Sequence, residues 1–256
     1  MKPVLPILLM CILLLSPACH NEMGCEPSDL TLMTRAQVGT VAPMHRLLVF
    51  GDASGGNGNA CLFNYAFVSG SRISPGSGTY RFVTLGNADC LELPAAGTTD
   101  GIGFDGLLPL KSGATLGNIL ASQPEKVVCP DTRVYTASLR PATCLLKLTL
   151  QDAPEDIVLK LKNMPSGLSF SGTYTDDEAF QQAYPLQEGE NVCLPTAANA
   201  QLQYETDGTT GVLDLGVTLE AGYTYQIPLQ WQAGKIGLSS EVTIWNSGEN
   251  TTGSAD

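Results

Sequence analysis

Hydrophobic and polar residues alternate along a long stretch near the C-terminus. Residues 213–219 and 223–231 place apolar side chains at every second position, with polar or small residues between them. Because successive side chains of a β-strand point to opposite faces, this period of two predicts half-buried strands. Gly222 and Gly234 interrupt the alternation where hairpin turns would be expected. The pattern predicts an antiparallel meander over residues 213–245, whose third run contains Ile236, Leu238, Val242 and Ile244.

The rest of the chain carries shorter segments of the same kind. Residues 47–50 form an apolar run that is typical of a central strand, whereas residues 61–68 and 79–85 alternate. Further alternating runs occupy residues 146–150 and 157–161. No helical period continues for more than two turns. The chain is therefore expected to be built from strands and turns.

The number of strands and the spacing of turns fit two tandem β-sandwich domains. Pro141 marks a plausible boundary between them. We expect the first sandwich over residues 31–140 and the second over residues 141–256. The predicted fold class is thus all-β.

Composition and charge narrow the possible functions. The chain has 256 residues, of which 43% are hydrophobic and 15% are charged, so a packed core is possible and the charged fraction is low. Its formal net charge is -12, and lysine and arginine form no cluster. An acidic chain without a basic patch repels phosphate backbones, so nucleic-acid binding is not expected.

The N-terminus has the features of an export signal. Residues 4–15 are uniformly apolar, which is too short for a transmembrane helix but suits a secretory signal. We interpret residues 1–18 as the signal peptide, Cys19 as the lipid-attachment residue of a bacterial lipoprotein, and residues 19–30 as a tether. Ordinary signal cleavage after Ala18, without lipid, is the alternative.

Six cysteines follow the predicted lipid site. An even number in an exported chain permits up to three disulfides, and at least one is predicted. By strand parity, Cys61 and Cys144 are also interpretable as small buried hydrophobic residues. No two cysteines have a C-x-x-C spacing, which makes a zinc site improbable. The six are Cys25, Cys61, Cys90, Cys129, Cys144 and Cys193.

Groups suited to catalysis are scarce. The chain has two histidines, His20 beside the lipid site and His45 at the edge of a strand, and it lacks a G-x-S-x-G motif. Residues 51–59 form a Gly-rich loop, but it lacks the Lys-Ser/Thr of a phosphate loop, and Asp52 with Asn57 and Asn59 provides too few acidic ligands for a calcium site. Acidic residues lie mainly in turns or on polar strand faces. We therefore expect no enzyme activity, no metal and no cofactor.

Several short segments together resemble the fimbrillin family, the pilin-like lipoproteins of Gram-negative anaerobes. They begin with the lipoprotein-like start and a Thr-Arg-Ala sequence, and end with a Tyr-rich strand followed by Ile-Trp-Asn. They are short, but they are spread along most of the mature chain. The segments are residues 33–36, 77–87, 139–140, 159–166, 219–225 and 242–246.

The resemblance implies two transthyretin-like β-sandwiches and a role in a surface fimbria. In polymerising relatives an Arg-specific protease cuts after the first strand, and removal of that strand opens a groove for a strand of another subunit. Such exchange is β-augmentation at an unpaired sheet edge. By this resemblance the cut is expected between Arg35 and Ala36, with Arg46 as the alternative site.

The resemblance leaves the role of the subunit open among stalk, tip and anchor. Residues 246–256 are polar and make a poor donor strand, so a donor would have to come from residues 241–245. Anchors of this family keep their lipid and are not cut. The expected partners are other fimbrial subunits, the outer membrane through the lipid, and a surface ligand for adhesion. The expected location is the cell surface, as an outer-membrane lipoprotein or within a fimbrium.

Two other functions remain open. One is a monomeric surface lipoprotein that binds a glycan or a peptide for nutrient uptake. The other is a secreted hydrolase, which would have to use His45 or a pair of carboxylates.

Overall fold

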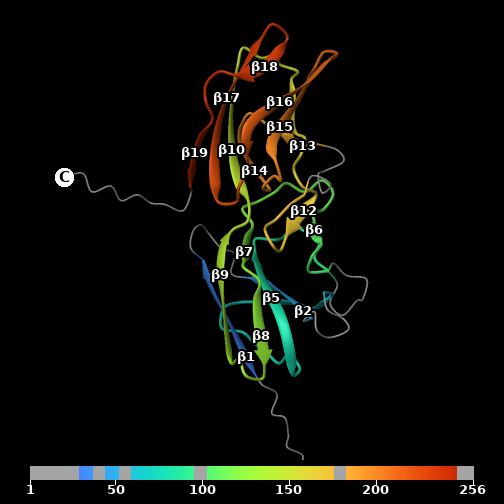
Figure 1. The fold of residues 1–256 in the computed structure, drawn as a ribbon, viewed down its shortest axis with the longest axis vertical. Helices are drawn as coiled ribbons and strands as arrows, with labels where there is room; N and C mark the ends of the chain where they lie inside the picture. The colour runs from blue at the N-terminus through green and yellow to red at the C-terminus, as the bar shows by residue number, and fades with distance from the viewer. Residues whose placement is uncertain (1–28, 37–43, 52–58, 95–102, 176–182, 247–256) are drawn as a thin grey trace, which may run out of the picture.

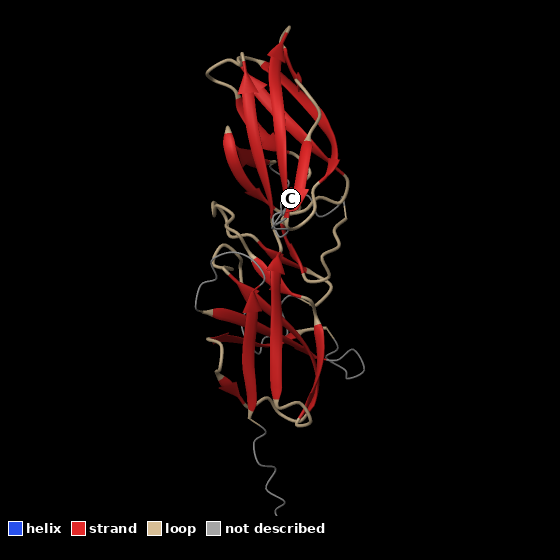
Figure 2. Ribbon diagram, turned by 90° about the vertical axis from the view of Figure 1, so that its left-hand side faces the viewer, coloured by secondary structure: helices blue, strands red, loops and turns tan. Residues whose placement is uncertain are grey.

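The protein consists of β-strands connected by loops in every part of the chain that can be described. The computed structural model describes residues 29–36, 44–51, 59–94, 103–175 and 183–246. Within those ranges the regular elements are strands, which confirms the all-β prediction, and no helix is long and apolar enough to cross a membrane. The strands form two groups stacked along the long axis (Figures 1 and 2). We call them the N-terminal strand group, residues 30–141, and the C-terminal strand group, residues 144–246.

The N-terminal strand group is one curled eight-stranded sheet. Its strands are β1 (Leu30–Ala36), β2 (His45–Gly51), β3 (Cys61–Phe67), β4 (Arg72–Ile73), β5 (Gly78–Gly86), β7 (Leu120–Ser122), β8 (Glu125–Cys129) and β9 (Val134–Pro141). They follow the order β3–β2–β5–β7–β9–β1–β4, and β8 also pairs with β5. The rings of Phe82 in β5 and Tyr135 in β9 lie 5.1 Å apart, although these strands are not neighbours in that order. The sheet therefore folds over and encloses a core.

Strand β2 is buried on both of its faces. Leu47 and Val49 point into the core enclosed by the curled sheet, which we call the N-terminal core. Leu48 and Phe50 point the opposite way, into a second core that also receives residues of the C-terminal strand group. A strand covered on both faces needs apolar residues at successive positions. The prediction of a central strand from residues 47–50 is confirmed.

The C-terminal strand group is a sandwich of two sheets. One sheet contains β10 (Cys144–Gln151), β14 (Gly189–Cys193), β17 (Tyr223–Gln232), β18 (Lys235–Leu238) and β19 (Thr243–Asn246). The other contains β11 (Val158–Leu161), β13 (Tyr184–Leu186), β15 (Asn199–Thr206) and β16 (Thr209–Thr218). The rings of Tyr204 in β15 and Trp231 in β17 meet edge to face, with centroids 5.8 Å apart. The two inner faces thus pack against each other.

The predicted meander over residues 213–245 is wrong in its connections. Strand β16 pairs with β15, whereas β17 lies in the opposite sheet, parallel to β10. The segment around Gly222 is therefore a crossover between sheets, and only the turn at Gly234 closes a hairpin, between β17 and β18. Alternation reports which face of a strand is buried, but it does not identify the neighbouring strand. Both sheets of a sandwich present the same alternating pattern.

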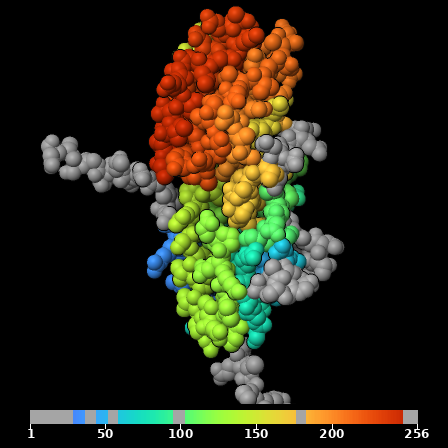
Figure 3. All heavy atoms as spheres, in the orientation of Figure 1, coloured from blue at the N-terminus to red at the C-terminus, as the bar shows by residue number. Residues whose placement is uncertain are grey.

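A small sheet and a continuous core join the two strand groups. Strand β6 (Leu107–Pro109) pairs with β12 (Gly167–Ser169) across the junction. The rings of Phe50 and Phe170 lie 5.1 Å apart in the core that both groups share. In Figure 3 the yellow surface around β12 lies directly against the green surface of the N-terminal strand group. The proposed domain limits at residues 140 and 141 stay a prediction.

Gly167 provides a test of this junction. A Cβ atom at Gly167 would lie 2.8 Å from the carbonyl carbon of Leu108, so the β6–β12 backbone would have to shift. We expect Gly167→Ala to lower the free energy of unfolding by about 2 kcal/mol, measured by urea denaturation. Gly117→Ala is the matched control, because a Cβ atom there would meet no other atom within 4 Å and its change should be below about 0.5 kcal/mol. Equal losses in both variants would contradict a tight junction.

Candidate functional site

Strand β1 completes the sheet of the N-terminal strand group. It runs parallel to β9, with pairs from Thr31 opposite Val134 to Ala36 opposite Leu139. Its other edge meets β4 over only two residues. Beyond β4, Leu32 exchanges backbone hydrogen bonds of 2.7 and 2.8 Å with the loop at residues 70–71. One edge of β1 is therefore paired along β9. On the other edge the backbone pairing covers residues 30–32, and further along the N–H of Thr34 donates a 3.1 Å hydrogen bond to the Ser69 hydroxyl.

The side chains of β1 divide into a buried and an exposed set. Leu30 and Leu32 are completely buried in the N-terminal core, while Met33 and Arg35 point outward. Burying one leucine side chain contributes roughly 1.5–3 kcal/mol. Loss of β1 would therefore open an apolar groove and leave the β9 edge unpaired. This is the arrangement that an incoming amphipathic strand could occupy.

The predicted processing site lies at the end of β1. Arg35 is exposed, and its backbone is paired with Ser138 of β9. The alternative residue, Arg46, is partly buried in β2, which is paired on both edges with β3 and β5. A protease would have to disrupt two ladders to reach Arg46 but only one to reach Arg35. Cys19, the predicted lipid site, lies outside the described residues.

His45 connects β1 to β2 close to the predicted cut. Its Nε2 atom lies 3.1 Å from the hydroxyl of Thr34, and its ring packs on Phe67 with centroids 5.5 Å apart. The ring is 5% exposed, and its Nδ1 atom is buried with no hydrogen-bond partner among the described residues. Burial lowers the pKa of His45 below its usual 6.5. The neutral imidazole thus holds the end of β1 in place.

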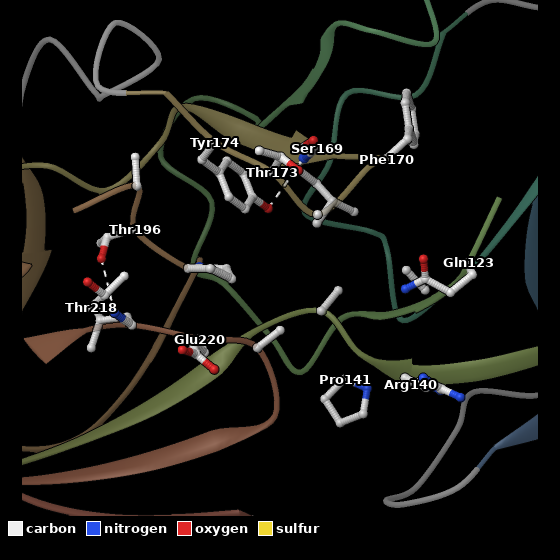
Figure 4. Close-up of a pocket in the computed structure, with 18 of the residues that line it drawn as sticks. Gln123, Arg140, Pro141, Ser169, Phe170, Thr173, Tyr174, Thr196, Thr218 and Glu220 are labelled. Atoms are coloured by element: carbon white, nitrogen blue, oxygen red, sulfur yellow. Dashed lines mark hydrogen bonds between the residues drawn. The ribbon is translucent and has the colours of Figure 1, made fainter. Parts of the chain in front are cut away.

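A cavity of about 480 Å³ lies at the junction of the two strand groups. Figure 4 shows Gln123 and Arg140 on one side of it, Glu220 on another, and Phe170 and Tyr174 on the loop that follows β12. The Tyr174 hydroxyl accepts a 3.3 Å hydrogen bond from the backbone N–H of Ser169. Its lining combines buried apolar residues such as Leu168 and Phe170 with exposed polar ones such as Arg140, which suits a small polar ligand.

Strand β19 lies at an exposed edge of the C-terminal strand group. It pairs with residues 223–226 of β17, and all four of its residues are exposed. Ile244 and Trp245 are 46% and 39% exposed, although Ile244 shares the parity of the predicted apolar face. This strand overlaps at residues 243–245 with the segment, residues 241–245, from which a donor strand was predicted to come.

The described cysteines are free thiols, so the expected disulfide is not present in this structure. Cys61, Cys129, Cys144 and Cys193 are buried and Cys90 is partly buried, whereas Cys25 lies outside the described residues. The interpretation of Cys61 and Cys144 as buried residues is confirmed. In the described part of the chain, no three acidic, histidine or cysteine residues cluster as metal ligands would.

Sequence reasoning missed two features of these sites. It found neither the contact between Thr34 and His45 nor the junction cavity. The contact joins two strands, β1 and β2, that do not pair with each other but are brought together where the sheet curls over, and the cavity is lined by residues from both strand groups. Neither feature produces a local sequence pattern.

Comparisons with known proteins agree with this architecture. Residues 57–251 match the family model of the fimbrillin-A associated anchor proteins Mfa1 and Mfa2, which is well over half of the chain. No curated protein matches the sequence.

Three solved structures have a similar fold, each at 12% sequence identity. A protein of Bacteroides thetaiotaomicron named as a candidate polysaccharide-binding protein has a TM-score of 0.56, covering 84% of this chain and 97% of its own. A candidate adhesin of the same species has a TM-score of 0.53, covering 85% and 96%. The fimbrial anchor protein Mfa2 of Porphyromonas gingivalis has a TM-score of 0.51, covering 86% and 97%.

The buried His45 predicts a dependence of stability on pH. Because its pKa in the folded state is below the unfolded value of about 6.5, protonation favours the unfolded chain. The stabilising contribution is therefore complete above about pH 6.5 and is lost as the pH falls toward the folded pKa. We expect the urea midpoint of the wild type to fall between pH 7.5 and 5.0 by more than that of His45→Gln.

The other histidine supplies the control for this experiment. His20→Gln should follow the wild-type pH profile, since His20 lies in the predicted tether and carboxylate titration is common to all three proteins. If His45→Gln and the wild type lose the same stability on acidification, the buried imidazole does not contribute.

Proposed function

The chain belongs to the family of fimbrillin-A associated anchor proteins Mfa1 and Mfa2, and we propose that it is an anchoring subunit of a bacterial surface fimbria. Membership supports a fimbrial, adhesin-like role at the cell surface rather than an enzymatic one. Within the range of stalk, tip and anchor, the name of the family favours the anchor. The subunit would be held at the outer membrane through a lipid on Cys19 and would contact other fimbrial subunits.

Retention of β1 is central to this proposal. Leu30 and Leu32 fill the N-terminal core, so the sheet is complete while β1 stays in place. An anchor that keeps both its lipid and β1 needs no cut at Arg35. A cut between Arg35 and Ala36 would instead separate the lipid-bearing end and release β1, as a propagating subunit requires.

The contact with the next subunit is proposed at the β17–β19 edge, by β-strand addition. Strand β19 has four residues, none of them buried, and residues 239–242 before it form no strand. Displacing β19 would therefore cost little apolar burial, in contrast to displacing β1. It would free the segment around Trp245 to join another sheet, or leave residues 223–226 of β17 to receive a strand. The single observation that carries the proposal is this exposed, weakly held edge in a member of an anchor family.

A second candidate function is binding of a glycan or a peptide by a monomeric surface lipoprotein. The observation that favours it is the junction cavity, whose lining includes the polar residues Gln123, Arg140 and Glu220. A structural neighbour from Bacteroides thetaiotaomicron is named for polysaccharide binding. Glycan-array binding by an intact, monomeric chain would favour this function over the fimbrial one.

Mass spectrometry of the mature protein tests the anchor assignment. We expect an acylated Cys19 at the N-terminus of a chain that still contains the bond between Arg35 and Ala36. Cys19→Ala should abolish acylation and release the protein from the membrane fraction. Cys25→Ala, a nearby cysteine, should leave acylation unchanged. A mature chain that begins at Ala36 would contradict the anchor role and indicate a propagating subunit.

Two truncations test the proposed edge. Removal of residues 243–256 takes away β19, and we expect a thermal midpoint within about 5 °C of the wild type but loss of incorporation into fimbriae, followed by immunoblotting of sheared fimbriae. Removal of residues 247–256 alone is the control and should leave incorporation intact. If the shorter truncation already prevents assembly, the contact lies in the tail and not in β19.

A further inference from the structure

Cys144 and Cys193 face each other inside the C-terminal strand group. They are direct partners in the antiparallel pairing of β10 with β14. Directly opposed residues place their side chains on the same face of a sheet, and here both side chains are buried, with exposures of 3% and 0%. The Cys144 thiol lies 3.4 Å from the carbonyl oxygen of Cys193. The two sulfur atoms therefore occupy the same small region of the core.

This placement is close to the geometry of a disulfide. Opposed residues of an antiparallel pair have Cα atoms roughly 4.5–5.5 Å apart, within the roughly 4.4–6.8 Å found across disulfides. Their Cβ atoms lie roughly 4.5–5.5 Å apart, whereas a disulfide needs roughly 3.5–4.5 Å. A small approach of the two strands, with a change of side-chain rotamer, would close this gap.

The other described cysteines are placed differently. Cys61 lies opposite Phe50, and Cys129 lies opposite Gly78. Cys90 lies outside the named strands. Among the described residues, one pair of cysteines thus stands in direct register across two strands.

We propose that Cys144 and Cys193 form a cross-strand disulfide in the exported protein. The two thiols lose two protons and two electrons, and the electrons reduce the disulfide of a thiol–disulfide oxidoreductase to a dithiol by way of a mixed disulfide. The inference rests on the proposed surface location, because an exported chain passes through a compartment where disulfides form.

Burial determines when this bond forms. It raises the pKa of the Cys144 thiol to about 12, and burial and the neighbouring Cys144 raise the pKa of Cys193 well above its usual value. Because the thiolate is the attacking species, the folded, reduced protein reacts slowly. The bond therefore forms while β14 is still docking onto β10, before the sandwich excludes the oxidant.

The bond has a structural consequence for the five-stranded sheet. Strand β14 is at one edge of that sheet, and β18 and β19 are at the opposite side of β17. A covalent link between β14 and β10 prevents the displacement of β14 and leaves β19 as an edge strand that can be displaced. Strand exchange, in which an edge strand is replaced, is thereby directed to the β19 side of this sheet.

Oxidative refolding of the full mature chain tests the proposal. The chain is denatured, reduced, and refolded with a mixture of reduced and oxidised glutathione, then mapped as peptides without reduction. We expect one linked pair that contains Cys144 and Cys193 in most molecules. We also expect a Tm on the order of 10 °C higher than that of protein refolded in dithiothreitol. Free, alkylatable thiols at both positions, or a link from either one to a different cysteine, would overturn the proposal.

Paired variants provide the controls. The double variant Cys61→Ala with Cys129→Ala removes two buried thiols of similar exposure and should keep the link and the redox-dependent Tm difference. The double variant Cys144→Ala with Cys193→Ala should lose that difference. Persistence of the difference in the second variant would overturn the assignment. The peptide map of the wild-type protein tests for the disulfide directly, even if a variant fails to fold.

Protein taken from cells separates this inference from the proposed function. Intact cells are treated with an alkylating reagent before lysis, and surface exposure of the protein is measured separately by protease accessibility. A linked pair in surface-exposed protein supports the proposal. Free Cys144 and Cys193 in surface-exposed protein would overturn the disulfide while leaving the fimbrial role intact, whereas absence from the surface would contradict the fimbrial role itself.

Discussion

Backbone N–H and C=O groups at the edge of a sheet must be paired with water or with another strand, and the rest of this structure depends on how each edge meets that requirement. In the N-terminal strand group the sheet curls over, so that β1 is paired with β9 and its leucines complete the core. In the C-terminal strand group β19 covers part of β17 without burying a side chain. One edge is thus stabilised by apolar burial, and the other mainly by backbone hydrogen bonds, which contribute less.

The shared core keeps these two edges in a fixed relation. Phe50 of the N-terminal strand group packs on Phe170 of the C-terminal strand group, and β6 pairs with β12 beside them. Well-packed cores transmit displacement because they contain few voids. A displacement at one strand group is therefore transmitted through this packing to the other strand group. The junction cavity lies between the two groups.

Much of the fold could be predicted from the sequence, because half-buried strands record their buried face in a period of two. The apolar run at residues 47–50 and the alternation at residues 223–231 identified β2 and β17 correctly. The pairing of strands could not be predicted, since β16 and β17 carry the same pattern but belong to opposite sheets. The same limit applies to the candidate site. Arg35 was identified from a family resemblance, whereas the contact between Thr34 and His45 depends on how the sheet curls to bring together two strands that do not pair with each other.

The two parallel strand pairs have a mechanical consequence for a surface protein. Strand β1 runs parallel to β9 over six residue pairs, and β10 runs parallel to β17 over seven. Tension that pulls the strands of such a pair in opposite directions along their axes shears all of the hydrogen bonds together, whereas tension across a hairpin breaks them one after another. Forced unfolding is governed by the rate of crossing the unfolding barrier. Strand pairs loaded in this way would yield slowly under a sustained pull.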